Sequence, residues 1–427
     1  MQKTLSLLLI QLLVVTAALS QKHFVKSKNG QFKLDDKFYY YIGTNYWYGS
    51  FLALEKDPKR GIERLRTELD FLKQNGVTNL RVIGGAEGSG KILGNYRVGP
   101  PLQPSKNVFD TSVLYGLDVL LDEMDKRDMK AVIFFSNNWE WSGGFLQYLN
   151  WNGLLSDAAL QEKMEWETMR DNISKFYTSE PCKDGYLKQV DVLLKRKNTV
   201  NGRKYTDDPV IMSWQIANEP RPMRPAANNA YKQWIKDVAG YIKGVDKNHL
   251  VSIGHEGEIG TQDINLYEEI HADKNIDYLT IHIWPKNWQW MRATHMQEDY
   301  NKVDSLTTNY ITKHLRVADH LNKPLVIEEF GFPRDHMQFA PATPTKLRDK
   351  YYHHILSFLK NKTNNLAGIN FWAFNGVARP IKGQLFWKPG DDYMGDPPME
   401  EQSLYGVFDT DITTWKVISQ HVRRLRK

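Results

Sequence analysis

The sequence predicts an α/β protein, a (β/α)8 TIM barrel with long loops at the C-terminal face of its strands. Three observations support this prediction: short apolar runs recur eight times, amphipathic segments separate them, and no Gly/Ser-rich or Pro-rich linker divides the 427 residues. The alternation occupies about 335 residues, whereas a barrel usually needs about 250. We therefore expect the excess to lie in loops. A doubly wound parallel sheet is the alternative that the same alternation allows.

The apolar runs give the expected strands, and the amphipathic segments give the expected helices. The strands are expected at residues 39–43, 79–83, 130–135, 210–216, 250–254, 278–283, 324–328 and 368–372. The helices are expected at residues 61–74, 112–127, 229–244, 309–321 and 345–360. Long insertions follow strands at residues 84–110, 137–208 and 374–406. Because barrels keep their active sites at this end of the strands, the insertions are expected to surround one.

The composition narrows the functional classes. Hydrophobic residues make up 41% of the chain and charged residues 25%, which excludes a disordered or collagen-like protein. The net charge of +6 is spread along the chain, so we expect no nucleic-acid partner. Aromatic residues are abundant and include 13 Trp. Surplus Trp is typical of grooves that bind flat ligands such as sugar rings.

The N-terminus has the features of a secretory signal peptide. Lys3 precedes an apolar run over residues 5–19, and Ala18 and Ser20 are small residues where a signal peptidase reads them. We expect cleavage after Ser20, so that residues 1–20 are removed and residues 21–427 form one catalytic domain, secreted or periplasmic. No second apolar stretch could hold the mature chain in a membrane, and we expect a monomer.

One glycine-rich segment matches part of the phosphate-binding loop motif. Residues 85–91, Gly-Ala-Glu-Gly-Ser-Gly-Lys, match the first seven positions of that motif. Ile92 stands where Ser or Thr would ligate magnesium, and Gly94 and Pro100 follow where a helix should begin. We therefore expect a glycine-rich surface loop and no nucleotide site.

Two of the expected strands run into a glutamate. The fourth leads into Ala217-Asn218-Glu219-Pro220-Arg221, and the seventh leads into Glu328-Glu329-Phe330-Gly331. Side chains alternate along a strand, so at most one of Glu328 and Glu329 should face the barrel mouth. Either motif alone could be a pair of solvated glutamates. Together, Glu219 and Glu329 lie about 110 residues apart, which suits three βα units, and two carboxylates across a barrel mouth can cleave a glycosidic bond.

Eight short motifs occur in order along the chain: Asn45-Tyr46-Trp47, Leu80-Arg81-Val82, Asn137-Asn138-Trp139, Ala217-Asn218-Glu219-Pro220-Arg221, His255-Glu256-Gly257, Ile281-His282-Ile283-Trp284, Glu328-Glu329-Phe330-Gly331 and Phe371-Trp372. This ordered set resembles glycoside hydrolase family 5, and within it the secreted endo-β-1,4-mannanases. The resemblance covers nearly all of the mature chain. It implies a secreted enzyme that cleaves internal β-1,4 links of mannan, glucomannan or galactomannan by a retaining mechanism, without cofactor or metal.

The resemblance also implies roles for individual residues. Glu219 would be the acid/base and Glu329 the nucleophile. Arg81 would keep the nucleophile ionised, Asn218 would hold the sugar hydroxyl beside the scissile bond, and Trp372 would lie under the cleaved sugar. The full set of expected substrate-binding residues is Arg81, Asn218, Arg221, Glu256, His282, Trp284, Trp372 and Trp139.

The chain departs from the family pattern at two places. Trp284 stands where the family usually has a tyrosine, and an indole can donate one hydrogen bond but cannot accept one. The chain also has no histidine between His23 and His249, although many members carry one near the third strand. That role is either vacant or taken by Asn137 or Asn138.

Two other functions remain possible on the sequence. An endo-β-1,4-glucanase would use the same chemistry; Arg221, which matches an arginine that reaches a leaving-group mannose in mannanases, favours mannan, as does the His-Glu-Gly stretch at Glu256. A non-catalytic carbohydrate-binding protein would bind a β-glycan without releasing sugar. The presence of Arg81 and of both glutamates disfavours it.

The last insertion contains an acidic cluster. Asp391, Asp392 and Asp396 lie among Gly and Pro residues, and carboxylates at such spacing can hold calcium. We expect a solvated turn there instead.

Overall fold

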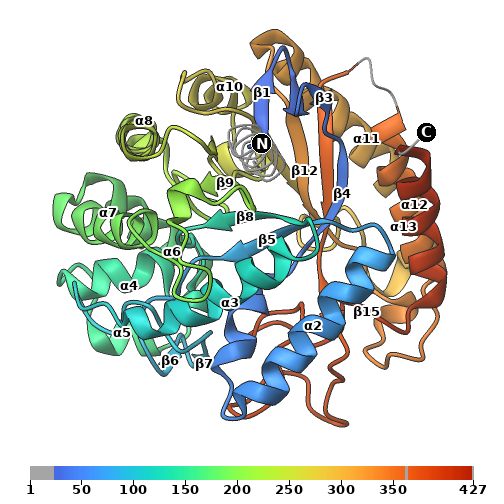
Figure 1. Cartoon of the computed structure of the whole chain (residues 1–427), viewed down its shortest axis with the longest axis horizontal. Helices are drawn as coiled ribbons and strands as arrows, with labels where there is room; N and C mark the ends of the chain where they lie inside the picture. The colour runs from blue at the N-terminus through green and yellow to red at the C-terminus, as the bar shows by residue number, and fades with distance from the viewer. Residues whose placement is uncertain (1–23, 361–363, 426–427) are drawn as a thin grey trace, which may run out of the picture.

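The structure is a computed structural model that describes residues 24–360 and 364–425. The expected signal peptide, residues 1–20, lies outside the described residues. Eight parallel strands form a nearly closed barrel with helices packed around it (Figure 1), so the predicted fold class is confirmed. The strand order is β10-β9-β8-β5-β4-β13-β12-β11. The barrel strands are β4 (Tyr41–Asn45), β5 (Asn79–Ile83), β8 (Lys130–Phe134), β9 (Ile211–Gln215), β10 (Leu250–Ser252), β11 (Leu279–Ile283), β12 (Leu325–Phe330) and β13 (Leu366–Phe371).

The barrel strands are buried on both faces. Every residue of β5, β9 and β11 is buried, one face by the barrel interior and the other by the surrounding helices. This double burial explains why the strands read as continuous apolar runs. The largest differences from prediction lie at strand ends: the first strand begins at Tyr41, and the seventh continues to Phe330, which places Glu329 inside it.

The helices alternate with the strands. They are α2 (Pro58–Gln74), α3 (Leu114–Asp125), α4 (Gly144–Trp151), α5 (Asp157–Gln161), α6 (Trp166–Ser174), α7 (Glu180–Leu194), α8 (Asn228–Val245), α9 (Glu258–Thr261), α10 (Ile264–His271), α11 (Met296–Leu321), α12 (Lys346–Ser357) and α13 (Ile412–Leu425). α11 begins well before the predicted residue 309 because Tyr300, Val303 and Thr307 extend its buried stripe. None of the described helices is both long and apolar enough to cross a membrane.

The insertion at residues 137–208 is mostly helical, contrary to the expected loop. It contains α4 to α7, and α7 is the helix that leads back to the barrel at β9. Aromatic packing holds this unit together: Phe145 and Phe176 stack with ring centroids 4.2 Å apart, and both meet the edge of Trp234 on α8. The insertion therefore forms a rigid wall beside the barrel mouth.

A small antiparallel sheet, which the sequence did not predict, covers the other end of the barrel. Its strands are β1 (Lys26–Lys28), β2 (Gln31–Leu34) and β3 (Lys37–Phe38). Phe32 meets the edge of Tyr278 at 5.2 Å, and both belong to an apolar cluster that includes Tyr41 and Leu250 at the starts of two barrel strands. This end of the barrel is therefore closed by packing, which leaves the C-terminal ends of the strands for a site.

The glycine-rich segment is only partly at the surface. Residues 85–88 are buried, and Glu87 accepts hydrogen bonds from Gly144 N at 3.1 Å and from Gln189 Nε2 at 2.7 Å. The prediction of a surface loop is therefore wrong for residues 85–88, because the hydrogen bonds of Glu87 attach this segment to α4 and α7. A hairpin of β6 (Lys91–Ile92) and β7 (Asn95–Tyr96) follows where a phosphate-binding loop would require a helix.

The last insertion starts at β14 (Phe374–Gly376) and ends at β15 (Val407–Phe408), which pair with each other. Asp396 is buried within it and accepts hydrogen bonds from Ser403 N at 2.8 Å and from Gly406 N at 3.3 Å. The expected solvated turn is therefore wrong for Asp396, whose carboxylate organises the loop. Asp392 instead pairs with Arg60 at 2.7 Å, so these carboxylates do not converge on a cation.

Candidate active site

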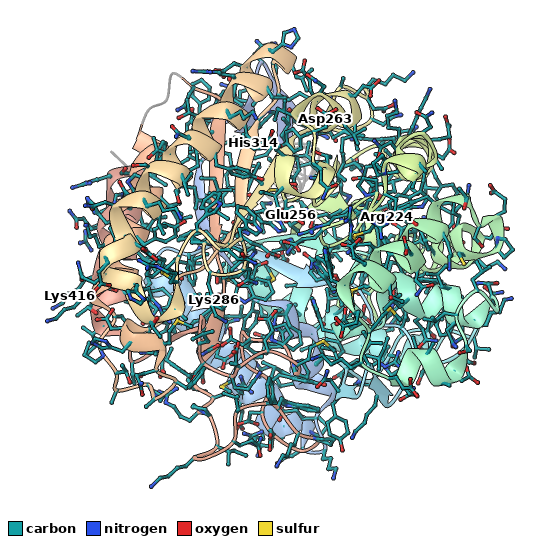
Figure 2. All side chains as sticks on the ribbon, turned by 180° about the vertical axis from the view of Figure 1, so that it is seen from behind. Arg224, Glu256, Asp263, Lys286, His314 and Lys416 are labelled. Atoms are coloured by element: carbon teal, nitrogen blue, oxygen red, sulfur yellow. The ribbon has the colours of Figure 1, made fainter. Side chains whose placement is uncertain are left out.

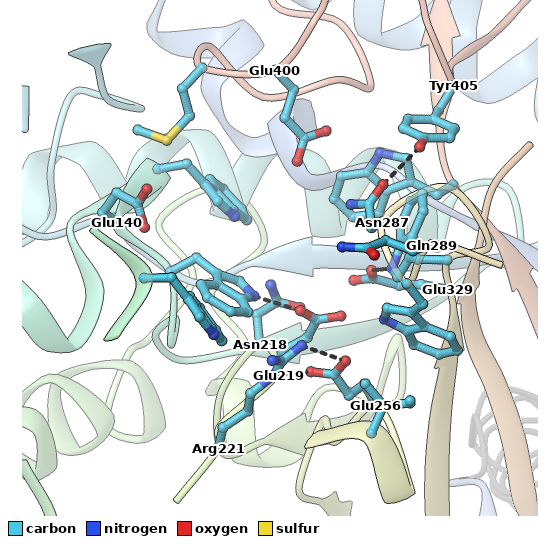
Figure 3. A pocket seen from close by; sticks show the side chains of 18 residues that line it. Glu140, Asn218, Glu219, Arg221, Glu256, Asn287, Gln289, Glu329, Glu400 and Tyr405 are labelled. Atoms are coloured by element: carbon cyan, nitrogen blue, oxygen red, sulfur yellow. Dashed lines mark hydrogen bonds and ion pairs between the residues drawn. The ribbon is translucent and has the colours of Figure 1, made fainter. Parts of the chain in front are cut away.

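A cavity of about 610 Å³ lies at the C-terminal ends of the barrel strands (Figure 3). Eight of the ten expected site residues line it, and the other two, Arg81 and His282, are buried beside it in contact with its carboxylates. The lining residues are Trp139, Glu140, Trp141, Trp166, Asn218, Glu219, Arg221, Glu256, Ile259, Trp284, Asn287, Trp288, Gln289, Glu329, Trp372, Met399, Glu400 and Tyr405.

Glu219 reaches the cavity because the backbone beyond β9 continues alongside the chain that follows β10. Ala217 N donates to Ile253 O at 3.2 Å, and Glu219 N donates to Gly254 O at 2.9 Å. Gly254 has a φ of +82°, and a Cβ there would lie 2.0 Å from Ala217 O, so glycine is required. Glu219 itself has a φ of +49°. Such strain at a non-glycine residue is typical of functional positions.

The two adjacent glutamates of β12 project to different places. Glu329 lines the cavity, whereas Glu328 is buried in the barrel interior, where Gln215 Nε2 donates to its two carboxylate oxygens at 2.8 and 2.7 Å. This arrangement agrees with the predicted alternation and excludes two solvated glutamates. One carboxylate oxygen of Glu329 and one of Glu219 lie within 4.8 Å of each other. The barrel thus brings together two carboxylates that lie far apart in the sequence.

Arg81 on β5 is fully buried and makes three hydrogen bonds near the two carboxylates. Its Nη1 donates to Glu329 Oε1, its Nη2 donates to Asn218 Oδ1 at 2.7 Å, and its Nε donates to Gln215 Oε1 at 2.8 Å. A charge-assisted bond of this kind favours the ionised carboxylate. Arg81 therefore opposes protonation of Glu329 and at the same time fixes the amide of Asn218.

His282 on β11 lies among three carboxylates. Its Nδ1 is 2.6 Å from Glu219 Oε1 and 3.3 Å from Glu329 Oε2, and its Nε2 is 3.7 Å from Glu328 Oε2. Burial alone would lower its pKa, but the carboxylates of Glu329, Glu219 and Glu328 raise the pKa of His282 to about 10. The imidazole therefore keeps a second proton throughout the neutral range.

The pKa of Glu219 is set mainly by its partners. Burial would raise it, but the hydrogen bond and charge of His282, the charge of Arg221 and the indole of Trp139 lower the pKa of Glu219 to about 2. Trp139 Nε1 donates to Glu219 Oε2 at 2.5 Å. The proton between Glu219 and His282 therefore lies on the imidazole, one short hydrogen bond away from the carboxylate.

The pKa of Glu329 moves in the opposite direction. The pKa of Glu329 is raised to about 7 in total. Burial has the largest effect and raises it, the charges of His282 and Arg81 lower it, and the charges of Glu219 and Glu328 raise it. The two carboxylates therefore differ in proton affinity although they face the same cavity. Such separated pKa values are typical of catalytic acid and base pairs.

Trp284 supplies a donor to Glu329 in place of the usual tyrosine. Its Nε1 donates to Glu329 Oε2 at 3.3 Å, and its ring meets the edges of Trp372 at 5.7 Å and of Tyr405 at 5.0 Å. The larger ring fits because Gly331 has no side chain; a Cβ there would lie 2.6 Å from the indole. The support of Glu329 thus differs from the expected tyrosine but retains one donor.

Arg221 and Glu256 form an ion pair at the cavity wall. Arg221 Nε donates to Glu256 Oε2 at 2.5 Å, and Nη2 donates to Oε1 at 2.7 Å, so the guanidinium fork that was expected to face a sugar is occupied by Glu256. The guanidinium carbon of Arg221 also lies 4.9 Å from the Trp139 ring centroid. Nη1 is the nitrogen that this pair leaves for a ligand.

Glu219, His282 and Glu329 are the one group of described residues whose arrangement could hold a metal ion. The chemistry of these donors does not fit one, because His282 carries a proton on both ring nitrogens and Arg81 already bonds Glu329. The same three groups fit acid–base and nucleophilic chemistry, for which a proton and an ionised carboxylate are both needed.

The sequence profile of the family described as GH family 5 beta-mannosidase-like matches residues 22–427. The chain belongs to glycoside hydrolase family 5. It is 30% identical over 365 residues to mannan endo-1,4-beta-mannosidase 1 of Arabidopsis thaliana, which covers 82% of this chain and 81% of that protein. The family expected from the motifs is confirmed, and the protein is a glycoside hydrolase.

Solved structures agree with this assignment. The family 5 mannosidase of Rhizomucor miehei superposes with a TM-score of 0.84 at 32% identity, over 95% of this chain and 98% of that one. A variant of the same enzyme in complex with mannosyl-fructose has a TM-score of 0.83 at 31% identity, over 94% and 97% of the two chains.

In this family 5 hydrolase, two asparagines follow β8 where many members have a histidine. Asn137 Oδ1 accepts a hydrogen bond from Asn218 Nδ2 at 3.1 Å, and Asn138 Oδ1 accepts one from Arg221 N at 3.2 Å. Neither lines the cavity. They position Asn218 and Arg221, which do line the cavity, and do not face the cavity themselves.

Sequence reasoning missed several residues of this hydrolase's cavity. They come from two of the insertions, from α9 and from the loop after β11: Glu140, Trp166, Ile259, Asn287, Gln289, Met399, Glu400 and Tyr405. Most carry no strand-end pattern and belong to no motif of the ordered set. The one available signal was the surplus of Trp, which predicted a sugar groove but did not single out Trp166 or the other residues of this list.

Proposed function

We propose that this family 5 hydrolase cleaves β-1,4-mannosidic bonds of mannan, glucomannan or galactomannan with net retention at the anomeric carbon. The observation that carries the proposal is the buried pair Glu219 and Glu329, with carboxylate oxygens within 4.8 Å of each other. Retaining glycosidases hold two carboxyl groups about 5 to 5.5 Å apart, whereas inverting ones need about 6.5 to 9.5 Å to admit a water. The spacing supports direct attack by one carboxylate.

In the first step, a carboxylate oxygen of Glu329 attacks the anomeric carbon while the glycosidic oxygen takes a proton from Glu219. The carbon–oxygen bond breaks, and the leaving sugar departs with that proton as its new hydroxyl hydrogen. Glu329 then carries the sugar as an ester. Arg81 and Trp284 lose their charged acceptor as this bond forms, so both favour its later release.

In the second step, Glu219 accepts a proton from water, and the water oxygen attacks the anomeric carbon. The ester bond breaks, Glu329 regains its charge, and the sugar leaves with its original anomeric configuration. The sum of both steps adds one water across the glycosidic bond, so no other reactant is required.

The hydrogen bond between His282 and Glu219 accounts for the low pKa of the acid. An imidazolium beside a carboxylate and an imidazole beside a carboxylic acid differ only in where one proton lies along a 2.6 Å contact. His282 thus stores the proton that Glu219 delivers. A substrate oxygen at Glu219 and loss of charge on Glu329 both favour its transfer to the carboxylate.

The names of the relatives support mannan as the substrate, since the Arabidopsis protein is a mannan endo-1,4-beta-mannosidase and the Rhizomucor protein a mannosidase. The test is a panel of polysaccharides assayed for reducing ends. We expect mannan or glucomannan to be cleaved at least about tenfold faster than carboxymethylcellulose, a difference of about 1.4 kcal/mol in the barrier. Faster cleavage of carboxymethylcellulose would make the protein an endoglucanase.

The mode of attack has two candidates. Cleavage of internal bonds is the mode named for the Arabidopsis relative. Release of single sugars from chain ends is favoured by a wall on the Glu329 side: Tyr405 Oη donates to Asn287 Oδ1 at 2.9 Å, and Lys286 Nζ lies 3.6 Å from Glu401 Oε2. These contacts join the loop after β11 to the last insertion, and sugars beyond the cleaved one would have to pass that wall.

Glu400 strengthens the chain-end candidate. It projects from the last insertion into the cavity, across from Glu219 (Figure 3). Burial raises its pKa well above its usual range, and the carboxylates of Asp396 and Glu329 raise it further. Protonated Glu400 can donate a hydrogen bond to a terminal hydroxyl. Mannose as the earliest product from mannopentaose would establish chain-end release, and mixed oligosaccharides would establish internal cleavage.

We also propose that the mature enzyme is secreted or periplasmic and acts as a monomer. The support for secretion is the signal-like sequence of residues 1–20. N-terminal sequencing of the exported protein should begin at Gln21, and an N-terminus that retains Lys3 would contradict the proposal.

A further inference from the structure

Buried side chains outside the cavity hold the segment that carries Glu256. Residues 255–259 follow β10 and lead into α9, and Glu256 and Ile259 of this segment line the cavity. Glu256 O accepts hydrogen bonds from His282 N at 3.0 Å and from Tyr310 Oη at 2.8 Å. The segment is therefore bonded on one side to β11 of the barrel and on the other to helix α11.

Helix α11 approaches this segment so closely that only glycine fits at position 257. Gly257 has a φ of +109°, and a Cβ there would lie 2.3 Å from Tyr310 Oη and 2.7 Å from His314 Nε2. Tyr310 and His314 are four residues apart on α11, so they share one face of the helix. His314 lies close to Glu256 (Figure 2), and the face that it shares with Tyr310 is therefore the one that meets the segment.

The hydrogen bonds of His314 require a neutral imidazole. Its Nδ1 is 2.8 Å from Tyr310 O, which can only accept, so Nδ1 carries a proton and donates it. Its Nε2 accepts from Glu258 N at 2.9 Å, so Nε2 carries none. An imidazolium has no acceptor and would lose the bond to Glu258 N. Only the neutral ring can hold the segment at this point.

His255 holds the neighbouring amide in the same way. Its Nδ1 accepts from Gly257 N at 2.9 Å, so the consecutive backbone N–H groups of Gly257 and Glu258 both donate to imidazole nitrogens. The next backbone N–H, that of Ile259, donates to Tyr310 Oη at 3.4 Å. The first N–H groups of a helix have no acceptor within that helix. Side chains from other elements therefore supply the acceptors for the start of α9.

Burial keeps both imidazoles neutral. It lowers the pKa of His314 to about 4; the bond to Tyr310 O opposes this shift, and the charge of Lys313 adds to it. Burial also lowers the pKa of His255 well below its usual 6.5, and His271 lowers it further. The titratable and charged groups that face the two rings come from the loop after β9, α8, α9, α10, β11 and α11: Arg221, Tyr231, Glu258, Tyr267, His271, His282, Tyr310 and Lys313.

A shift of this segment would reach the cavity through Glu256. The Glu256 carboxylate binds Nε and Nη2 of Arg221 and so fixes the direction in which that guanidinium points. A backbone bond at Glu258 therefore acts on a cavity side chain at one remove. Small displacements of such groups are costly, because catalysis depends on the orientation of the groups that meet the substrate.

We propose that Tyr310 and His314 are positioning residues, which hold Glu256 and through it Arg221 in the orientation that meets the substrate, and that His314 does so only as a neutral imidazole. Neither residue lines the cavity, so neither touches the reacting atoms. The proposal rests on the proposed function, because an effect on rate requires Arg221 to contact a bound mannan chain.

Three variants test the positioning role by steady-state kinetics. His314→Leu removes the acceptor of Glu258 N and should lower kcat/KM for mannohexaose by roughly three- to tenfold, the effect of about one hydrogen bond. His314→Gln should recover at least about half of the original kcat/KM, because its amide oxygen can accept from the same N–H. Tyr310→Phe should cost less than His314→Leu, since His282 N still donates to Glu256 O.

His320→Leu is the matched control. His320 lies on the same helix, but its side chain is 74% exposed and pairs with Glu268. This variant should change kcat/KM for mannohexaose by less than about 1.5-fold. Thermal unfolding of every variant shows whether it is folded, and if His314→Leu is not, Tyr310→Phe takes its place in the experiments below.

A double-mutant cycle with Arg221→Ala separates positioning from a general structural role. In the Arg221→Ala background, His314→Leu should lower kcat/KM by less than about twofold, because the side chain that it positions is already gone. The same loss in both backgrounds would mean that His314 acts on the fold as a whole and would overturn the proposal. An unchanged kcat/KM in the single His314→Leu variant would overturn it too.

The pH dependence of stability tests the neutral state of His314. Because its pKa of about 4 in the folded protein lies below the ordinary 6.5, the unfolded chain binds one more proton between these values, so His314 lowers the stability as the pH falls from about 6.5 to 4. His314→Gln should remove about one proton from the uptake on unfolding in this window, measured from Tm against pH, whereas His320→Gln should leave the uptake unchanged. An unchanged uptake in His314→Gln would mean a charged ring and would contradict the proposal.

Amide hydrogen exchange separates this proposal from the proposed function, since it needs no substrate. His314→Leu should speed exchange in a peptide that spans residues 256–259 by at least about threefold, and His320→Leu should not. If the unmodified enzyme did not hydrolyse mannohexaose, the proposed function would fail while faster exchange still supported the hold of α11 on the segment. If hydrolysis were normal and exchange unchanged, the positioning proposal alone would fail.

Discussion

Glu329 stands in an enclosed half of the cavity, whereas Glu219 stands in a half that remains open. On the Glu329 side, the bond from Tyr405 to Asn287 joins two long loops, and buried aromatic rings pack edge to face against one another. On the Glu219 side, Trp166 is 45% exposed and a second cavity continues outward. The two carboxylates therefore line the same cavity, but the surroundings of Glu329 are enclosed and those of Glu219 are open.

This difference matches the chemistry that we assign to each half. The nucleophile must meet one sugar in one orientation, and buried aromatic rings on this side lower the local dielectric constant, which strengthens the charged contacts that Glu329 makes. The acid must protonate many different leaving groups, so open space beyond Glu219 is an advantage. The four predictions that follow test this contrast, from the largest expected effect to the smallest.

Removing each carboxylate should give the largest and most unequal effects. Glu329→Ala should reduce cleavage of every substrate by about 10⁴-fold or more, because no covalent step remains. Glu219→Ala should cost about 10² to 10⁴-fold on mannan but spare activated aryl mannosides, whose leaving group needs no proton. Steady-state kinetics on both substrates measure the contrast. Equal losses for both variants on both substrates would remove the division of labour.

Arg221→Ala should reduce mannan cleavage by about ten- to a hundredfold, since it removes a charged donor and leaves Glu256 buried without its partner. Burial already raises the pKa of Glu256 to about 7, so the variant should keep Glu256 protonated and remain folded at neutral pH. Kinetics and thermal unfolding are the measurements, and Arg221→Ala with Glu256→Gln is the control. An unfolded single variant alongside a folded double one would contradict the expected protonation.

Trp284→Phe should shift the pH dependence of activity. The indole donates only to ionised Glu329, so its loss should raise that residue's pKa, which burial has already raised to about 7. The ionised nucleophile is lost as the pH falls through this pKa. The acidic limb of kcat/KM should therefore move to higher pH by about half a unit, less than the full effect of a charged hydrogen bond because the contact is 3.3 Å long. An unchanged limb would mean that His282 and Arg81 control the charge of Glu329 without help from the indole.

Tyr405→Phe should change the overall rate least, by less than about threefold, since its hydroxyl contacts Asn287 and no carboxylate. It should nevertheless loosen the closed half and raise the share of products longer than mannose from mannopentaose. Chromatography of early products measures this share, with Tyr96→Phe as a control outside the cavity. An unchanged product pattern would mean that the wall does not decide the mode of attack.

The barrel and its central residues were predictable because they depend on local patterns. Eight apolar runs predicted the strands, since a strand buried on both faces has to be apolar along its length. Glu219 and Glu329 were marked by their places at strand ends and by the neighbouring motif residues. Arg81 and His282 are charged residues within apolar strands, and the structure places both against these carboxylates.

The open half of the cavity was much less predictable. Trp166 begins a helix inside an insertion that was expected to be a loop, and its position depends on the packing of Phe145 and Phe176 against Trp234. Such long-range packing leaves no periodic signal in the sequence. Glu256 was expected to touch the ligand, but its role as the partner of Arg221 required the spatial arrangement.

Azide rescue of the two alanine variants tests the assignment of the two halves most directly. Azide is a small anion that can replace a missing carboxylate as nucleophile, and the configuration of the mannosyl azide product records the face of attack. With Glu219→Ala, the account predicts β-mannosyl azide, because Glu329 still forms the ester. With Glu329→Ala, it predicts α-mannosyl azide. The opposite pair of configurations, read by NMR, would contradict the assignment of Glu329 as nucleophile and Glu219 as acid/base.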